Sequence, residues 1–460
     1  MIDKAVVLIY IAFIFIFGIY NSSKVKTDKE FSGGTKYSAF IIFCTLTASY
    51  MGGGFTIGLA EKTYKYGLLF VIAMFGFSIK EILIALYIAP QMKHFQNRCL
   101  TAGDIIQQSF GIKAKIFTGA ASILVCSGII GAQLATCGNI FESFIGISST
   151  YGTILTAIVI VSYTAWGGLK SVIKANVVHF IVLFTIIILV TTIGYVQIGG
   201  IKNLYFQTPN GYFDIFDEYS FLTLSVLFLS FFFGETLVPP YVQRLLIGKD
   251  EKETKKGTLY SGIASFFIFL FVGLIGIMAF VINKNLNPKF AFAFSMNYFL
   301  PVGLKGFGVA AMIAIIMSSA DAFMNAVSIA TKNDVLEPLF GRNKFTNNQL
   351  KYSRVVSLFI GLIATIFAIS SDSILDILLY SYQFWTPFIL VPLFVAIYKI
   401  RSTPKTFFVS SFSAILALVV WNSFFKKTSL AEGSLESVIA AISVNFIVFA
   451  VMQKLNKFKS

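Results

Sequence analysis

The segment Ala48-Ser-Tyr-Met-Gly-Gly-Gly-Phe-Thr-Ile-Gly-Leu-Ala-Glu61 combines three consecutive glycines, a further glycine and an acid within an apolar stretch that begins near Tyr37. In a helix interior each glycine costs about 1 kcal/mol relative to alanine, and a carboxylate at mid-membrane costs roughly a few kcal/mol more. A helix that only had to cross a bilayer would avoid this composition. The segment therefore predicts a membrane helix that is interrupted for a functional reason.

Close helix packing is the alternative explanation for these glycines. Gly54 and Gly58 have the four-residue spacing at which small residues let two membrane helices approach each other. That spacing does not explain Gly52 and Gly53. We therefore favour the interruption, and the packing role stays open.

A second interruption is expected in the segment Phe231-Phe-Phe-Gly-Glu-Thr-Leu-Val-Pro-Pro-Tyr-Val-Gln243. Pro239 and Pro240 remove backbone donors, and Gly234 and Glu235 lie near the middle of the apolar stretch. In lipid, the backbone groups freed by a break need ions, solute, water or protein as partners. Two such breaks at corresponding positions predict a binding site for ions or solute at mid-membrane.

The composition is that of an integral membrane protein. Of the 460 residues, 57% are hydrophobic and 12% are charged, and the mean hydropathy is +0.81; about a quarter of a soluble domain is charged. A helix needs about 20 apolar residues to cross a bilayer. We predict an all-α polytopic membrane protein with thirteen transmembrane helices, near residues 3–20, 38–61, 67–89, 114–141, 151–166, 172–197, 220–241, 258–282, 304–330, 354–370, 373–398, 404–423 and 435–453.

The net charge of +15 reflects membrane topology. With the N-terminus outside, 26 Lys and Arg residues fall in the loops and tail that face the cytoplasm, and 9 fall on the other side. Positive residues concentrate in cytoplasmic loops, so the pattern predicts an outside N-terminus and a cytoplasmic C-terminus. It gives no reason to expect a nucleic-acid partner. Abundant Lys, Ile and Phe with short loops indicate a bacterial inner membrane.

Each interruption opens a block of five predicted spans. A block with an odd number of crossings faces the opposite way from its successor, and paired interrupted helices are typical of secondary transporters built from inverted repeats. We divide the chain into an extra N-terminal helix and loop at 1–37, a first five-helix repeat at 38–197, a second at 198–398, and two C-terminal helices with a tail at 399–460.

Four segments carry a resemblance to a known family. They are Asp28-Lys-Glu-Phe-Ser-Gly-Gly34, Tyr163-Thr-Ala-Trp-Gly-Gly-Leu-Lys-Ser-Val172, Gln243-Arg244 followed by Lys249-Asp250, and Met317-Ser-Ser-Ala-Asp-Ala-Phe-Met-Asn325. In this order they resemble the sodium:solute symporter family over almost the whole chain. The resemblance implies an inverted five-plus-five helix (LeuT-like) core with two interrupted helices. It also implies sodium as the coupling ion, with no other cofactor.

The resemblance also implies one sodium site between the first and eighth core helices. Its ligands would be the main-chain oxygens of Ala48, Met51 and Ile315 and the hydroxyls of Ser318 and Ser319. Neutral oxygens suit a hard monovalent cation. The alternative is that both serines donate hydrogen bonds to carbonyls of their own helix, which is a common role.

One departure from the family pattern concerns a second cation. The signature normally continues with an Asp, but Asn176 stands in its place, so the acid of a second sodium site is an amide here. Asp321 follows Ser318 by three residues and lies on the same helical face. We expect Asp321 to take over from the missing acid, binding either a second cation or a proton; a hydrogen bond to a neighbouring helix is the alternative.

Eight residues are candidates for binding the solute because they are glycine, aromatic or polar at the interruptions or deep in the predicted spans. They are Tyr50, Gly53, Phe55, Glu81, Gln133, Phe232, Glu235 and Gln383. Residues 52–61 also resemble a segment of the family's choline-transporting branch. An aromatic cage for a quaternary or protonated amine is therefore one expectation. Amino acids, sugars and carboxylates stay open as alternatives.

Lys80 and Glu81 form an adjacent pair of opposite charges within a predicted span. Neighbouring residues on a helix point about 100° apart. We therefore expect each of the two to have a separate partner, although they could partly neutralise one another.

The sequence thus predicts a sodium-coupled symporter that imports a small organic solute by alternating access, and not an enzyme. Its partners would be sodium, the solute and the bilayer. A proton-coupled or uncoupled carrier of the same fold is one alternative, and a membrane sensor is another from a different class. No ATP-binding motif is present in the sequence.

Overall fold

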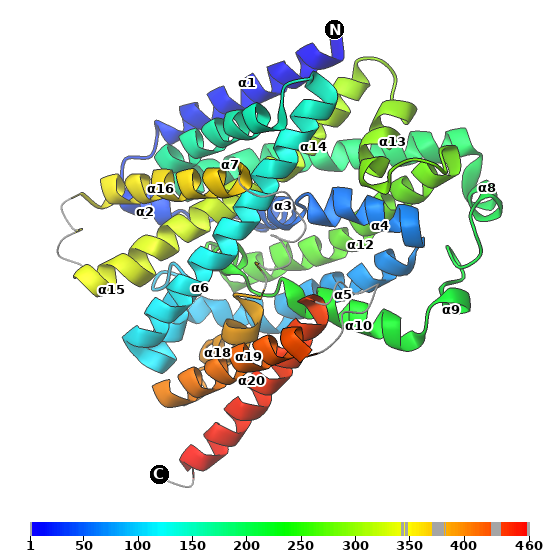
Figure 1. Cartoon of the computed structure of the whole chain (residues 1–460). Helices are drawn as coiled ribbons and strands as arrows, with labels where there is room; N and C mark the ends of the chain where they lie inside the picture. Colours follow the sequence, from blue (N-terminus) through cyan, green and yellow to red (C-terminus); the bar gives the residue numbers. More distant parts are fainter. Residues whose placement is uncertain are drawn as a thin grey trace.

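The computed structural model describes residues 2–341, 345, 348–369, 381, 383–424 and 434–457, and within these residues the chain is helical (Figure 1). The α-helices are α1 Ile2–Ser22, α2 Asp28–Ser32, α3 Ala39–Tyr50, α4 Leu59–Tyr66, α5 Leu69–Leu83, α6 Ala102–Ile140, α7 Ser149–Ile198, α8 Gly200–Gln207, α9 Ile215–Glu218, α10 Phe221–Gly234, α11 Pro239–Leu246, α12 Glu251–Ile282, α13 Ala291–Phe299, α14 Leu304–Ala330, α15 Glu337–Phe340, α16 Gln349–Ile369, α18 Thr386–Ile397, α19 Pro404–Phe424 and α20 Ser434–Lys457. Tighter or wider turns extend several of them: η1 Gly54–Gly58, η2 Ile84–Ile88, η3 Ala89–His94, η4 Phe141–Ile145, η5 Pro288–Phe290 and η6 Thr331–Leu336.

The predicted membrane spans agree with these helices. In the described part of the chain, nine helices are long and apolar enough to cross a membrane, or eleven if each of two bent pairs counts as one span. The predicted spans 151–166 and 172–197 lie within the single helix α7, which turns at Gly168, where φ is 54°. The predicted span 373–398 falls partly outside the described residues; its described part contains the short helix α18.

Both predicted interruptions are confirmed. The pair Ala39–Tyr50 and Gly54–Tyr66 is bent by 68°, and the pair Phe221–Gly234 and Pro239–Leu246 is bent by 57°. The proline pair begins α11, where a missing backbone donor costs nothing because the first turn has no partner for it. We call the two interruptions the first break (residues 51–53) and the second break (residues 235–238).

Helix α14 forms the centre of the molecule. In its most apolar window, 94% of the residues are buried, against 22% for α19. It packs against α6 and α7, and it also contacts α3 and α11. Helices α1, α7 and α16 lie on one side of the bundle and α18, α19 and α20 on the other (Figure 1). Residues on α14 therefore face both breaks from the middle of the fold.

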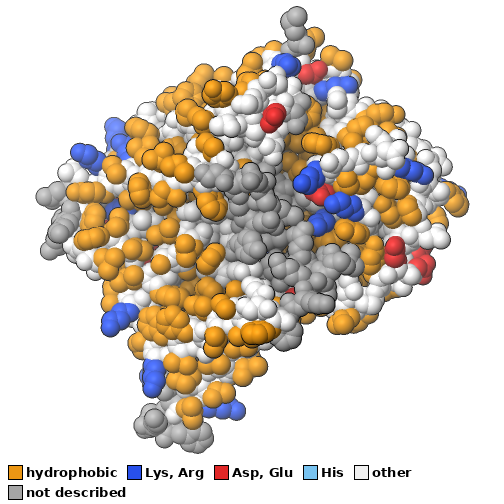
Figure 2. Space-filling model, in the orientation of Figure 1, with side chains coloured by type: hydrophobic (Ala, Val, Ile, Leu, Met, Phe, Trp, Pro, Cys, Tyr) orange, Lys and Arg blue, Asp and Glu red, His pale blue; other side chains and the backbone are white. Residues whose placement is uncertain are grey.

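The outer surface has the character expected of a protein in lipid. Figure 2 shows apolar side chains spread over much of the visible face. Many of the large apolar side chains on α1, α16 and α19 are exposed, including Ile9, Phe359 and Leu416. In a bilayer, such side chains contact lipid tails rather than water.

Candidate functional site

The first break brings carbonyls of α3 against hydroxyls of α14. Ser318 Oγ lies 2.9 Å from Ala48 O and 2.8 Å from Ile315 O, and its single hydroxyl hydrogen is shared by these two acceptors. Ser319 Oγ donates to Ser49 O at 2.8 Å. Ser319 therefore bonds across to α3, and Ser318 has one carbonyl of α3 and one of its own helix within reach. The alternative considered from the sequence, a hydrogen bond within α14, thus applies to Ser318 and not to Ser319.

This geometry gathers most of the predicted sodium ligands. Ala48, Ile315, Ser318 and Ser319 meet at one place, and the fifth, Met51, is fully buried at the end of α3. The sequence interpretation missed the Ser49 carbonyl, which is the partner of Ser319. A hydroxyl oxygen can rotate its hydrogen away, so an oxygen that donates here is also able to face a cation.

The glycines of the first break leave room for this contact. A Cβ at Gly52 would lie 2.8 Å from Ser319 Oγ and 3.0 Å from Gln133 Nε2, which is too close. Gln133, from α6, accepts a hydrogen bond from the Gly53 backbone N–H at 3.1 Å. A side-chain amide thus satisfies one backbone donor freed by the break.

The second break is held by side chains from two other helices. Thr386 Oγ1, at the start of α18, donates to Gly234 O at 2.7 Å. Lys80 Nζ, on α5, donates to Glu235 O at 3.3 Å. The chain then passes through Leu237, a residue with a positive φ of 50°, which is an uncommon conformation for a residue with a side chain.

Lys80 and Glu81 pair with each other, so the expectation of separate partners is wrong. Lys80 Nζ lies 2.7 Å from Glu81 Oε1, and both side chains are only 2% exposed. The four-carbon lysine stem is flexible enough to fold back toward its neighbour, although the two Cα–Cβ bonds diverge. Lys80 has a further partner at the second break, which the sequence did not indicate.

An aromatic cluster links the two breaks. Tyr50 lies 4.8 Å from Phe77 and 5.7 Å from Tyr241, measured between ring centroids. Phe55 lies 5.1 Å from Phe77 and 5.9 Å from Phe269. The Tyr50 hydroxyl oxygen lies 2.6 Å from Ser261 Oγ of α12, within hydrogen-bond distance.

The structure brings six of the eight solute candidates to this region and gives the side chains of the other two different neighbours. Tyr50, Gly53, Phe55, Glu81, Gln133 and Glu235 lie at the breaks or in contacts with them. The Phe232 ring packs against its neighbour Phe233, while Phe231 faces Phe55; the Phe232 carbonyl contacts the second break by accepting from Thr236 Oγ1 at 2.8 Å. Gln383 is buried and lies 3.5 Å from Asn422 of α19, measured from Gln383 Oε1 to Asn422 Nδ2.

Asp321 and Asn176 meet in the interior, between α14 and α7. The Asn176 amide, oriented so that both its ends are satisfied, donates to the two Asp321 carboxylate oxygens at 3.1 and 3.3 Å. The Tyr163 hydroxyl donates to Asp321 Oδ2 at 2.7 Å. Asp321 is fully buried. Tyr163 begins the family signature quoted above, so its place in the motif was the available signal for this contact.

A polar network closes the end of the bundle where α6 begins and α14 ends. Lys115 Nζ lies 2.7 Å from Asp104 Oδ1 and 3.8 Å from Asp334 Oδ1. Thr101 donates to Asp334 Oδ1 at 2.7 Å. Sequence reasoning did not single out these residues, because their spacing along the chain is large.

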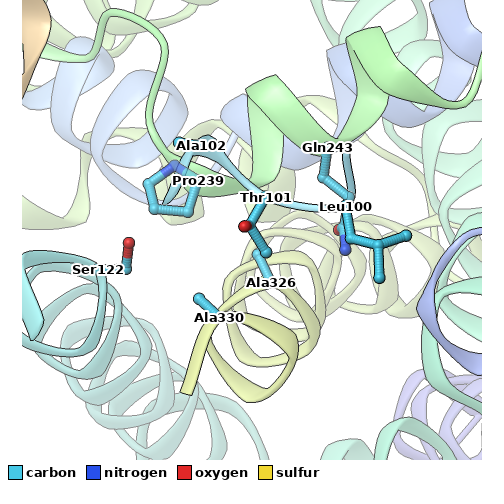
Figure 3. A pocket seen from close by; sticks show the side chains of 8 residues that line it. All are labelled: Leu100, Thr101, Ala102, Ser122, Pro239, Gln243, Ala326 and Ala330. Carbon is cyan, nitrogen blue, oxygen red and sulfur yellow. The ribbon is translucent and has the colours of Figure 1, made fainter. Parts of the chain in front are cut away.

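A small pocket lies beside this network (Figure 3). It is lined by Leu100, Thr101, Ala102, Ser122, Pro239, Gln243, Ala326 and Ala330. It leaves about 10 Å³ for the centre of a water molecule, which is roughly the room that one water needs. This pocket between α6, α11 and α14 is therefore too small to hold an organic solute.

Comparison with known proteins gives consistent results. The model of the sodium:solute symporter family matches residues 31–413. An osmoregulated proline transporter of Bacillus subtilis is 23% identical, with 98% of each chain covered. A high-affinity choline transporter of Drosophila melanogaster is 23% identical over 80% of this chain and 62% of its own.

The solved structures show the same fold. A sodium-coupled sialic acid symporter, in a substrate-bound outward-open state, superposes with a TM-score of 0.85 at 20% identity and covers 98% of both chains. The predicted fold class is therefore confirmed. The relatives are symporters rather than enzymes, which confirms the prediction of a transporter.

Proposed function

The chain belongs to the sodium:solute symporter family, and we propose that it moves one small organic solute together with sodium by alternating access. The observation that carries the proposal is the contact at the first break. There the hydroxyls of Ser318 and Ser319 lie 2.8–2.9 Å from carbonyls of α3. These oxygens are neutral, buried and close together, as a site for a desolvated monovalent cation requires.

The sodium ion would bind the carbonyl oxygens of Ala48, Met51 and Ile315 and the two serine hydroxyls. The carbonyls at the end of α3 also carry the negative end of that helix's dipole, which favours a cation. A helix that continued unbroken would use these carbonyls in its own hydrogen bonds. The break at Gly52 and Gly53 thus supplies the ligands.

Sodium entry would drive solute accumulation. Each sodium contributes roughly 2.3 kcal/mol per 100 mV of membrane potential and about 1.4 kcal/mol per tenfold concentration ratio. Together these would accumulate a neutral solute by roughly several hundredfold. Alternating access would involve rocking of the core bundle, with the ion and solute bound at the breaks.

The solute site that we propose lies between the breaks. Glu81, Gln133 and Glu235 supply polar groups there, and Tyr50 and Phe55 supply aromatic faces. Relatives named for proline and choline transport place an amino acid and an amine among the candidate cargoes, beside a sugar and a carboxylate.

A second ion would bind at Asp321. Its carboxylate lies beside Asn176, the residue that stands where the family has an acid. The donors Tyr163 and Asn176 stabilise the charged carboxylate in the absence of a second ion, and a proton is the alternative occupant. Asp321→Asn is expected to change the cation dependence of uptake; unchanged dependence and stoichiometry would show that Asp321 has only a structural role.

The orientation follows from the distribution of Lys and Arg. We place the N-terminus outside and the C-terminus in the cytoplasm of a bacterial cell, with the protein in the inner membrane. The network of Asp104, Lys115 and Asp334 then lies on the cytoplasmic side. The small pocket in Figure 3 would be part of the closed exit path.

The test is the thermal stability of the purified protein in sodium compared with potassium. We expect sodium to raise the melting temperature of the wild type, and the double variant Ser318→Ala/Ser319→Ala to lose that increase. Ser328→Ala is the matched control, because Ser328 is a buried serine of the same helix that donates only within it, to Met324 O at 2.7 Å. A sodium effect that survives in the double variant would contradict the site.

A further inference from the structure

We propose that Lys80 fills an amine-binding corner of the solute site from within the chain, so that the transporter rejects alkylammonium solutes and takes uncharged or anionic ones. This inference rests on the proposed function and names the substrate class of the same site. It opposes the amine cage expected from residues 52–61. The corner is formed by Phe77, Tyr241 and Glu81 together with the backbone of Glu235.

The Lys80 ammonium is bound as a protein binds an amine ligand. Its Nζ lies 3.6 Å from the centroid of the Phe77 ring and 5.3 Å from that of Tyr241. On other sides it meets Glu81 Oε1 at 2.7 Å and Glu235 O at 3.3 Å. Aromatic faces with a carboxylate and a carbonyl are the groups that recognise ammonium cations.

The occupied corner lies where a solute would be expected. Tyr50, which lies between the proposed ligands Ala48 and Met51, packs against both Phe77 and Tyr241. Phe55, just after the first break, packs against Phe77. A solute held between the breaks therefore meets these rings, and an ammonium group already occupies the space beside them.

Displacing Lys80 to admit a cationic solute would be costly. The side chain is 2% exposed, and its withdrawal would leave the Glu81 carboxylate buried without its ion-pair partner. A buried charge without a partner is strongly unfavourable. A cationic solute would gain at this corner only the contacts that the displaced Lys80 ammonium loses. An uncharged or anionic solute would not need to displace Lys80.

The experiment compares choline with its uncharged carbon analogue, 3,3-dimethylbutan-1-ol, as ligands of the sodium-loaded protein. We expect no choline-dependent thermal shift in the wild type. Lys80→Met removes the ammonium while keeping an apolar side chain of similar length. It should create choline binding at least about tenfold tighter than that of the wild type. The uncharged analogue should show no such gain.

Two further variants separate selectivity from folding. Lys80→Arg retains the positive charge and should remain insensitive to choline. Phe77→Leu in the Lys80→Met background should abolish the gained choline binding, because it removes the nearest aromatic face. Sodium-dependent choline binding by the wild type would overturn the proposal. So would a folded Lys80→Met variant with no gain, because it would limit Lys80 to a structural role.

The readout also distinguishes this inference from the proposed function. The sodium effect on stability is measured without any solute, and it reports on the first break alone. A wild type with no sodium effect would refute the sodium site whatever choline does. A wild type with a normal sodium effect that binds choline would refute only the selectivity of Lys80.

Discussion

The two breaks differ in the side chains that hydrogen-bond to their free backbone carbonyls. Each ends a helix inside the bundle and leaves carbonyls without partners. At the first break, neutral groups meet them: serine hydroxyls bond to Ala48 O and Ser49 O. At the second, Lys80 bonds to Glu235 O and Thr386 bonds to Gly234 O.

The helix dipole acts at both breaks, because each break follows the C-terminal end of a helix. The C-terminal end of a helix carries a partial negative charge and favours a cation. At the second break that cation is a side chain, fixed in the fold and paired with Glu81. At the first break the described contacts to the carbonyls come from neutral hydroxyls, which is the condition for the exchangeable sodium that we propose there. The comparison indicates that a site for an exchangeable ion must lack a charged side chain, such as Lys80, at the helix end.

The largest expected effect comes from unpairing the fixed cation. Glu81→Gln removes the carboxylate that lies 2.7 Å from the buried Lys80 ammonium, and we expect it to lower the free energy of unfolding by about 3–5 kcal/mol. The measurement is thermal or denaturant unfolding in detergent. The rise of the melting temperature in sodium should persist, because the first break is unchanged.

Glu61→Gln provides the control for this prediction. Glu61 pairs with Lys65 at 2.9 Å in a partly exposed ion pair on α4, and such pairs contribute about 0–1 kcal/mol. If Glu81→Gln were as mild as Glu61→Gln, the fixed charge at the second break would have little importance, and the contrast between the breaks would fail.

An intermediate effect is expected from adding one methyl group at the first break. A Cβ at Gly52 would lie 2.8 Å from Ser319 Oγ, so Gly52→Ala should cost about 1–3 kcal/mol. It should also abolish stabilisation by sodium, because it displaces a proposed ligand. Both quantities come from the same melting curves in sodium and potassium.

Two glycines serve as controls for Gly52→Ala. At Gly53 a Cβ would meet nothing closer than 3.4 Å, and at Gly234, the last residue before the second break, it would meet nothing within 4 Å. Gly53→Ala and Gly234→Ala should therefore retain the sodium effect. Loss of that effect in Gly234→Ala would mean that the two breaks respond as one unit.

Sequence reasoning reached the breaks themselves because their cause is local. Three glycines at one position and two prolines at the other are poorly tolerated in the interior of a helix, so both interruptions were predictable. The meeting of Ser318 with Ala48 followed from the family resemblance. None of these inferences needed a distance between helices.

The partners from distant helices were not predictable in this way. Thr386 reaches Gly234 O across 152 positions of sequence, and Lys80 reaches Glu235 O across 155. Helical geometry also led to the wrong expectation that Lys80 and Glu81 would not pair, because the flexibility of the lysine stem outweighs the direction of its Cα–Cβ bond. Side-chain reach and tertiary packing decide such contacts.

The smallest expected effect concerns the hydrogen bond from Thr386 to Gly234 O, the contact beside the second break that involves no charged group. Thr386→Val removes the hydroxyl that donates to Gly234 O at 2.7 Å. A buried carbonyl that loses its partner costs about 1–3 kcal/mol. Here the effect should fall near the lower end, because Lys80 still bonds to the adjacent Glu235 O.

Thr365→Val is the matched control, since Thr365 donates within α16 to Gly361 O at 2.7 Å, a carbonyl that lies inside a regular helix. Unfolding measurements on both variants check the difference. If Thr386→Val also weakened the stabilisation by sodium, the hydrogen bond from Thr386 to Gly234 O would contribute to the sodium site. Charge alone would then not distinguish the two breaks.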